Sequence, residues 1–321
     1  MICLVFNGYY RSGTTIFYRI LKESNRDKLI FYEPLAPVIP EKLINRHEIA
    51  KSTKLHGFNP WDCYLKPEFK KVRYEYLHNL LELRDSYSRI SKCCKSVDIL
   101  PFHLDRIVER LFDMLSYTGD KVIIQPNRCH FILREISKRY GCPFIHIIRN
   151  PIDTWISQTF EPASKKVSFA SILLKIKTTT LGRGILTHML PKAPFAGNWF
   201  LICPDYKIIS ERFNLETNTK DWLDRVLIVW TYCNYYAFKQ ADDEKGMVVY
   251  YEEVTSEPER WLKIMSDFSG VNFDLRFAKI LKPRITKDES LKKHFVERLE
   301  RLGLLDMVNE FYPPKRWFGN S

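Results

Sequence analysis

A glycine-bracketed turn near the N-terminus has the residue types that hold a phosphate or sulfate group. Residues 8–15 read GYYRSGTT, and four residues separate Gly8 from Gly13. Glycines let the backbone turn tightly with its N–H groups facing inward. A helix that starts after such a turn adds partial positive charge at its N-terminus. The segment therefore predicts an anion cradle of backbone amides, to which Arg11 adds a cation with a planar donor fork.

The same turn differs from the loop that binds nucleoside triphosphates. The glycine spacing is that of a P-loop, but Thr14 occupies the position of the P-loop lysine. That lysine serves the β- and γ-phosphates of ATP or GTP, so its absence argues against ordinary triphosphate hydrolysis. A glycine-containing turn between any strand and helix is the alternative interpretation.

Five short apolar runs predict the strands that position this turn: residues 2–6, 29–32, 122–125, 144–148 and 247–251. Helical patterns lie between them at residues 15–23 and 101–116. Pro151 and Pro258 each occupy a plausible first helical position. This alternation predicts an α/β fold with a mainly parallel sheet of about five strands and helices on both faces.

Residues 1–321 are expected to form a single domain, because the chain has no internal repeat and no low-complexity linker. Residues 34–100 and 160–216 carry too many helix signals to be plain loops. We expect them to be helical insertions that build the acceptor side of a cleft.

Composition points to an ordered protein with an anionic partner. Hydrophobic residues make up 45% and aromatic residues 14% of the chain, which excludes disorder and collagen-like repeats. The formal net charge is +12. No apolar stretch reaches the length of about 18 residues that a membrane span needs. The first residues do not resemble a signal peptide, and the eight cysteines lack C-x-x-C spacing, so we expect reduced thiols and a cytoplasmic location.

Three segments together resemble the sulfotransferases that use 3′-phosphoadenosine 5′-phosphosulfate (PAPS). Residues 11–15 resemble the loop that binds the 5′-phosphosulfate. Residues 144–157, FIHIIRNPIDTWIS, resemble the 3′-phosphate motif, in which an arginine at a strand end is followed eight residues later by a serine. Residues 248–258 are similar to the late strand and turn of that family. The resemblance runs from near residue 2 to about residue 270.

This resemblance implies a P-loop NTPase-like fold with PAPS as co-substrate and 3′-phosphoadenosine 5′-phosphate (PAP) as product. It assigns Arg149 and Ser157 to the 3′-phosphate, and the 5′ end to a set of loop residues, namely Arg11, Ser12, Gly13, Thr14 and Thr15. A 3′-phosphate is a dianion that ATP lacks, and arginine suits it through bidentate hydrogen bonding.

Sulfuryl transfer needs a base near the acceptor hydroxyl and cations near the leaving oxygen. Residues 31–35, FYEPL, resemble the FEPL segment of carbohydrate-type sulfotransferases. This resemblance places Glu33 at the carboxyl end of the second strand, where ligands bind in open α/β sheets. Glu33 is the candidate base, and partial burial would have to raise its pKa. Its alternative role is to pair with an arginine and position a loop. Arg11 is the candidate for stabilising the leaving group.

The end of the third predicted strand departs from the cytosolic branch of the family. Gln125 and Asn127 fall where that branch carries lysine and histidine, and Asn127 cannot take a proton. Arg128 is a candidate for the missing charge. His103 and His130 are alternative bases that rank below Glu33. We expect no metal, because the chain has neither an H-E-x-x-H motif nor paired Cys/His spacing.

The leading hypothesis is a PAPS-dependent sulfotransferase that acts on a hydroxyl, favouring a carbohydrate or glycolipid over a steroid or phenol. Late basic contacts to the 3′-phosphate are expected from Lys282, Arg284 and Lys287. The alternatives are a P-loop small-molecule kinase with a degenerate Walker A loop and a basic nucleic-acid-binding protein. Dispersed positive residues count against a nucleic-acid partner, and basic pairs such as Lys70-Lys71 allow a peripheral membrane contact.

Overall fold

The computed structural model describes residues 1–36, 62–90, 100–160, 199–215, 219, 221–242, 244–283 and 285–318. The chain divides into two compact units. The first unit comprises Met1–Ile148 and Tyr236–Pro283, and the second comprises Arg149–Tyr235 and Arg284–Ser321. That the chain forms one functional domain stays a prediction.

The first unit is built on a sheet of five parallel strands. These are β1 (Ile2–Gly8), β2 (Leu29–Tyr32), β3 (Val122–Gln125), β4 (Phe144–Ile148) and β5 (Gly246–Tyr250). Their order is β2-β3-β1-β4-β5, and every neighbouring pair is parallel. The expected α/β, P-loop-like sheet is confirmed. Because β3 and β4 lie on opposite sides of β1, the carboxyl end of β1 is a switch point where ligands bind in such sheets.

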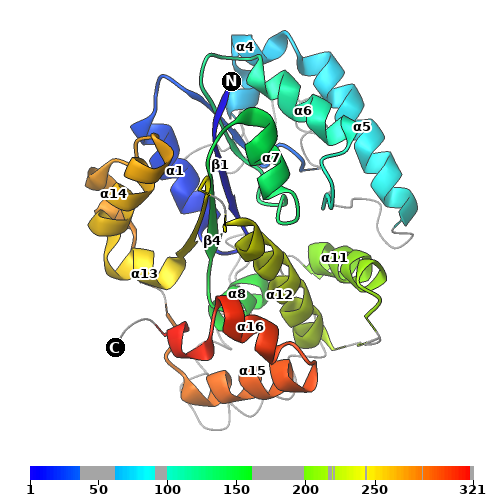
Figure 1. Cartoon of the computed structure of the whole chain (residues 1–321), viewed down its shortest axis with the longest axis vertical. Coiled ribbons are helices and arrows are strands. Elements are labelled where there is room, and N and C mark those ends of the chain that lie inside the picture. Colours follow the sequence, from blue (N-terminus) through cyan, green and yellow to red (C-terminus); the bar gives the residue numbers. More distant parts are fainter. Residues whose placement is uncertain are drawn as a thin grey trace. The chain divides into compact units, whose positions relative to one another are not determined.

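Helices cover both faces of this sheet. Figure 1 shows α1 (Thr14–Ser24), α13 (Tyr251–Ser256) and α14 (Pro258–Ser269) on one side of β1 and β4. On the other side lie α6 (Arg106–Ser116) and α7 (Leu133–Tyr140). The first unit also contains η1 (Asp62–Leu65), α4 (Pro67–Lys70), α5 (Arg73–Ile90) and η3 (Leu275–Ile280).

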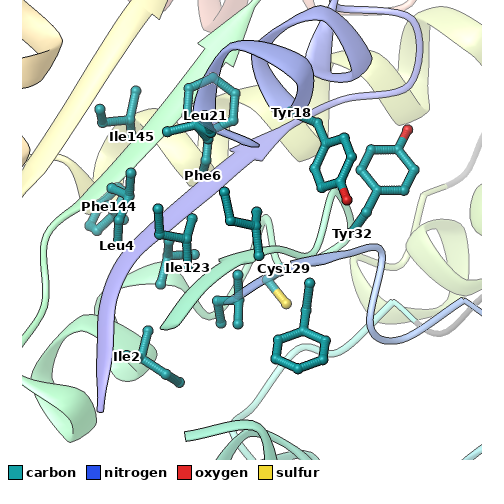
Figure 2. Packing of buried hydrophobic residues seen from close by; sticks show 14 of the residues in the cluster. Ile2, Leu4, Phe6, Tyr18, Leu21, Tyr32, Ile123, Cys129, Phe144 and Ile145 are labelled. Carbon is teal, nitrogen blue, oxygen red and sulfur yellow. The ribbon is translucent and has the colours of Figure 1, made fainter. Parts of the chain in front are cut away.

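The core of the first unit forms where α1 packs on the strands. The rings of Phe6 in β1 and Phe17 in α1 stack with centroids 5.1 Å apart. Figure 2 shows Tyr18 of α1 beside Tyr32 of β2, with ring centroids 5.0 Å apart. All four residues of β3 and all five of β4 are buried, which requires cover on both faces. This packing fixes the start of α1 against the ends of β1 and β2.

Two predicted boundaries differ from the structure. The helix expected at residues 101–116 begins at Arg106, because the Asp105 side chain accepts hydrogen bonds from the amides of Ile107 and Val108. The fifth strand ends at Tyr250, and Tyr251 already belongs to α13. Pro258 starts α14 as expected.

The second unit is helical in its described residues. It contains α8 (Pro151–Phe160), α11 (Trp199–Arg212), most of α12 (Trp222–Gln240), α15 (Glu289–Arg301), α16 (Leu305–Phe311) and η4 (Pro314–Arg316). Trp155 of α8 packs edge-on against Phe295 of α15 at 5.6 Å between centroids. Trp230 of α12 lies 5.4 Å from Phe311 of α16. Large aromatic side chains therefore hold these helices together.

The described parts of the two segments expected to be insertions contain helices, and that these segments build the acceptor side of a cleft stays a prediction. The first contains η1, α4 and α5, and the second contains α11. Residues 37–61, 91–99, 161–198 and 216–218 lie outside the described residues. Within the described part of the chain, no helix has the length and apolar character to cross a membrane.

Candidate active site

The turn between β1 and α1 presents backbone amides at a helix N-terminus. Both the amide and the hydroxyl of Ser12 donate to the carbonyl of Tyr9, at 3.1 and 2.6 Å. The carbonyl of Gly13 accepts from the amide of Ile16 at 3.0 Å. The first N–H groups of a helix have no intrahelical partner. The amides at the start of α1 are therefore suited to hold an anion.

Both glycines of the turn sit where a side chain would collide. A Cβ atom at Gly8 would lie 2.6 Å from side-chain carbons of Ile147 and Thr14. A Cβ at Gly13 would lie 2.5 Å from the ring of Tyr251. Gly13 also has φ of 94°, which L side chains rarely adopt. The tight turn expected from the sequence is present, and that its amides and Arg11 hold a phosphosulfate stays a prediction.

Three non-glycine residues with left-handed backbones follow three neighbouring strands. Arg11 comes after β1 with φ of 63°, Glu33 after β2 with φ of 47°, and Asn127 after β3 with φ of 54°. Arginine and glutamate seldom adopt this region, and each such residue costs about 1–3 kcal/mol. Strain of this kind concentrates at functional sites, and here it sits at one edge of the sheet.

Glu33 is held from the neighbouring strand by its main chain and its side chain. Its amide donates to the carbonyl of Gln125 at 2.8 Å, which extends the pairing of β2 with β3. Its carboxylate oxygen Oε1 accepts from Nδ2 of Asn127 at 3.1 Å. The side chain is half-buried. A carboxylate is thus placed at the carboxyl edge of the sheet, beside the turn.

Three of the predicted site residues affect the pKa of the Tyr32 hydroxyl. Its oxygen lies 3.1 Å from the side-chain oxygen of Thr15. Burial raises the pKa of Tyr32 well above its ordinary value, and the charge and hydrogen bond of Glu33 raise it further. The Thr15 hydrogen bond and the positive charge of Arg11 act in the opposite direction. The Thr15 hydrogen bond and the charges of Arg11 and Glu33 therefore all act on one tyrosine.

Sequence reasoning missed Tyr32 as a member of this site. The signal was a polar aromatic residue at the last position of a buried strand, directly before the candidate base. A buried tyrosine hydroxyl normally requires a hydrogen-bond partner. That requirement could have pointed from Tyr32 toward its neighbours.

Gln125 is fully buried and joins β3 to the first residue of α1. Its Nε2 donates to the carbonyl of Thr14 at 2.7 Å, while its Oε1 has no hydrogen-bond partner among the described residues. A neutral amide stands here, at the position where the resemblance expects a lysine. Positive charge at the carboxyl ends of these strands must come from other residues, and Arg11 lies within the turn itself.

Arg128 is a second arginine at the same edge of the sheet, and only 3% of it is exposed. Its guanidinium donates to the hydroxyl of Tyr10, and its central carbon lies 4.9 Å from the centre of the Tyr10 ring. Tyr10 belongs to the turn that holds Arg11. That Arg128 supplies the missing charge stays a prediction.

His130 lies in a buried polar cluster with Asn7 and His146. The Nδ2 atom of Asn7 lies 3.1 Å from Nδ1 of His130 and 3.0 Å from Nδ1 of His146. Burial lowers the pKa of His130 well below its ordinary value, and His146 and Arg128 lower it further. A low pKa makes His130 a weak base. His103 is exposed in the segment before α6.

Arg149 and Ser157 belong to the second unit. Arg149 directly follows β4 in the chain, and its carbonyl accepts from Nε1 of Trp230 at 3.1 Å. Ser157 is a buried residue of α8, which begins at Pro151 as predicted. Asn150 caps this helix, because its Oδ1 accepts from the amide of Asp153 at 2.7 Å. The roles of Arg149 and Ser157 in holding a 3′-phosphate stay predictions.

The late basic segment approaches α8 through its main chain. The amide of Thr286 donates to Oδ1 of Asp153 at 3.1 Å. Lys282 and Lys287 are exposed, and Arg284 lies outside the described residues. Their expected contacts to the 3′-phosphate stay predictions. No group of three or more His, Cys, Asp or Glu residues suited to a metal ion occurs among the residues searched, which are those that the structure describes.

Comparison with known proteins supports one family. The family described as "Sulfotransferase domain" matches residues 4–295. An uncharacterized protein of Archaeoglobus fulgidus is 58% identical over 323 residues, which cover 99% of this chain and 100% of that protein. The match therefore extends across both units of the structure.

Proposed function

The chain belongs to the sulfotransferase family, and we propose that it transfers a sulfuryl group from PAPS to a hydroxyl of an acceptor. The single observation that carries the proposal is that Tyr32, which directly precedes Glu33, hydrogen-bonds to Thr15 at the start of α1 and is acted on by the charges of Arg11 and Glu33. It joins a cation and a cradle of amides to a carboxylate at one sheet edge. These are the groups that sulfuryl transfer requires.

In this proposal Glu33 receives the proton that the acceptor hydroxyl loses as its oxygen bonds to sulfur. The S–O bond to the leaving phosphate breaks at the same time, and negative charge grows on that phosphate. Arg11 and the amides from Gly13 to Thr15 offset that charge, because donors fixed at a helix N-terminus need no reorganisation during the reaction. Thr15 and Asn127 hold the neighbouring Tyr32 and Glu33 in place.

Selection of PAPS over ATP is assigned to Arg149 and Ser157. The arginine would form bidentate hydrogen bonds with the 3′-phosphate, and the serine hydroxyl would add one more. Asn150 and Asp153 fix the start of the helix that carries Ser157. No metal is required in this scheme, since positive charge comes from side chains and backbone amides.

For the acceptor we propose a carbohydrate or glycolipid hydroxyl, on the resemblance of residues 31–35 to the carbohydrate-type members. A cytoplasmic location is proposed because scattered thiols stay reduced there. None of the five described cysteines forms a disulfide, and burial raises the pKa of Cys63, Cys129 and Cys142. A high thiol pKa disfavours the reactive thiolate.

The test is label transfer from radiolabelled PAPS to a panel of glycans and lipids, with EDTA present. We expect transfer to at least one hydroxyl-bearing acceptor. A Glu33→Gln variant should reduce turnover by about 10²–10⁴ and leave PAP affinity nearly unchanged. Phosphate transfer from ATP that depends on Mg²⁺, with no transfer from PAPS, would instead identify a kinase.

A further inference from the structure

Two side-chain amides form a continuous path from the start of α1 to the candidate base. Nε2 of Gln125 lies 2.7 Å from the carbonyl oxygen of Thr14 and 3.5 Å from Oδ1 of Asn127. Nδ2 of Asn127 lies 3.1 Å from Oε1 of Glu33. Gln125 is 0% exposed and Asn127 is 2% exposed. The two amide side chains are therefore shielded from water, which would otherwise compete for their hydrogen bonds.

The chemistry of the neighbours fixes the orientation of both amides. The carbonyl of Thr14 can only accept, so the nitrogen of Gln125 must face it. The same nitrogen then faces the oxygen of Asn127, which turns the nitrogen of Asn127 toward Glu33. Oε1 of Glu33 accepts this hydrogen bond, and such a bond is stronger when the carboxylate is ionised.

The backbone of Asn127 is part of this arrangement. Its φ of 54° is left-handed, a region that asparagine tolerates better than most residues. Pro126 precedes it, at the end of β3. The strained turn directs the amide toward Glu33, whose own φ is 47°. Glu33 and Asn127 thus both have strained backbone conformations, of the kind that concentrate at functional sites.

Other titratable or charged groups lie around Tyr32 and Glu33. Arg11 follows β1, and Tyr32 ends β2. The hydroxyls of Tyr64 and Tyr76 donate to the main-chain carbonyls of Tyr32 and Pro34. The Asn127 amide donates to the Glu33 side chain and, unlike the hydroxyl of Tyr32, is not a titratable group.

We infer that Asn127 is a positioning residue that keeps the Glu33 carboxylate ionised and directed for proton abstraction, with Gln125 holding Asn127 in turn. This inference rests on the proposed function, since it deepens the role of Glu33. Gln125 and Asn127 stand where the cytosolic branch of the family carries lysine and histidine. In this inference the two amides act on the carboxylate by hydrogen bonding, without a charged or basic side chain at either position. Removal of the donor disfavours the ionised carboxylate.

Two substitutions test the inference without disturbing the backbone. Glycine and aspartate both accept a left-handed φ, so Asn127→Gly removes the donor and Asn127→Asp replaces it with a like charge. Asn214 supplies a matched control, because it has φ of 49° and is exposed in the second unit. Asn214→Gly and Asn214→Asp change the same residue type in the same backbone region.

The first readout is the titration of the Glu33 carboxyl by ¹³C NMR without any nucleotide, assigned through the Glu33→Gln spectrum. We expect its midpoint to rise by roughly 1 pH unit in Asn127→Gly and further in Asn127→Asp. The second readout is the pH profile of kcat. Its acid limb should move upward by the same amount, with kcat at neutral pH lowered about 10- to 100-fold. Neither Asn214 variant should change either quantity.

An unchanged Glu33 midpoint in both Asn127 variants would overturn the inference, whatever happens to thermal stability. If Asn127→Asp does not fold, Asn127→Gly alone decides, since glycine carries no steric cost at this φ. Retained turnover in Glu33→Gln would remove the base assigned under the proposed function. The NMR midpoint would still report whether Asn127 controls the charge of Glu33, so the two failures are distinguishable.

Discussion

The side-chain oxygen of Thr15 lies 3.1 Å from the hydroxyl oxygen of Tyr32, which bonds the first turn of α1 to the end of β2. The anion cradle and the strand that leads to Glu33 are therefore parts of one hydrogen-bonded structure. Tyr32 is buried, so this bond is protected from water. A movement of the turn on nucleotide binding would be transmitted to the strand end that carries the candidate base.

Arg11 should matter more for chemistry than for stability. Replacing it with glycine relieves the left-handed strain at φ of 63° but removes the cation. We expect Arg11→Gly to keep the unfolding free energy within about 1 kcal/mol of the wild type and to reduce kcat by about 10²–10³. Arg11→Lys keeps the charge but loses the planar fork, so its kcat should lie between those of Arg11→Gly and the wild type. Chemical denaturation and steady-state kinetics measure both effects, and wild-type turnover in Arg11→Gly would contradict the role.

Arg149 and Ser157 should discriminate PAP from AMP, because only PAP has the 3′-phosphate. Arg149→Ala should weaken PAP binding by about 10- to 100-fold and Ser157→Ala by roughly 5-fold, with little change for AMP. Calorimetric titration with both nucleotides measures the ratio. Ser210→Ala, another helix serine of the second unit, serves as the control. Equal losses for PAP and AMP would remove the 3′-phosphate from these residues.

Acid should destabilise the first unit through His130. Burial holds the pKa of His130 well below its ordinary value, so below about pH 6.5 the unfolded chain binds a proton that the folded chain does not. The stability contributed by the neutral ring is full above that pH. It falls by up to about 1.4 kcal/mol per unit as the pH decreases.

The matching variant is His130→Gln, which stays neutral and can still accept from Asn7. Urea denaturation at pH 7.5 and 5.5 should show the wild type losing more stability than this variant. Parallel losses in the two proteins would show that His130 does not carry the effect.

The second unit should depend on the buried carboxylate of Asp224. It accepts from Nη1 of Arg298 and Nη2 of Arg301, each at 2.7 Å. Asp224→Asn leaves Arg298 with Asp221, 2.8 Å away, so we expect a cost near the lower end of a broken buried pair, about 3 kcal/mol. The control is Glu297→Gln in α15, the helix that carries Arg298. It removes an exposed ion pair with Lys293 and should lower the unfolding free energy by less than about 1 kcal/mol. Equal melting temperatures for both variants would contradict this.

The sheet was predictable because its physical signal is local. Strands such as β3 and β4 are buried on both faces, so they read as short apolar runs bounded by turn residues. The start of α6 was not predicted, although Asp105 is a good capping residue. Pro101 and Asp105 are both helix-start signals in the sequence. The structure shows that the helix starts after Asp105, whose carboxylate accepts hydrogen bonds from the amides of Ile107 and Val108.

The candidate site was predictable in its residue types and not in its connections. The turn, Arg11 and Glu33 follow from spacing and resemblance. The bond from Asn127 to Glu33 depends on two left-handed residues and on the register that pairs Tyr32 with Gln125. Neither the backbone angle of a non-glycine residue nor strand register can be read from composition or periodicity. The sequence alone therefore indicated that Gln125 and Asn127 replace the lysine and histidine of the cytosolic branch, and did not indicate their hydrogen bonds.

The contact between Gly13 and Tyr251 restricts how this protein can change over time. Shrinking the aromatic ring would open space beside the turn, but the φ of 94° at Gly13 would still strain any residue with a side chain. Relatives that carry a smaller residue at position 251 should thus still keep the glycine. The backbone conformation fixes the residue type at Gly13, whereas Tyr251 also packs in the core of the first unit.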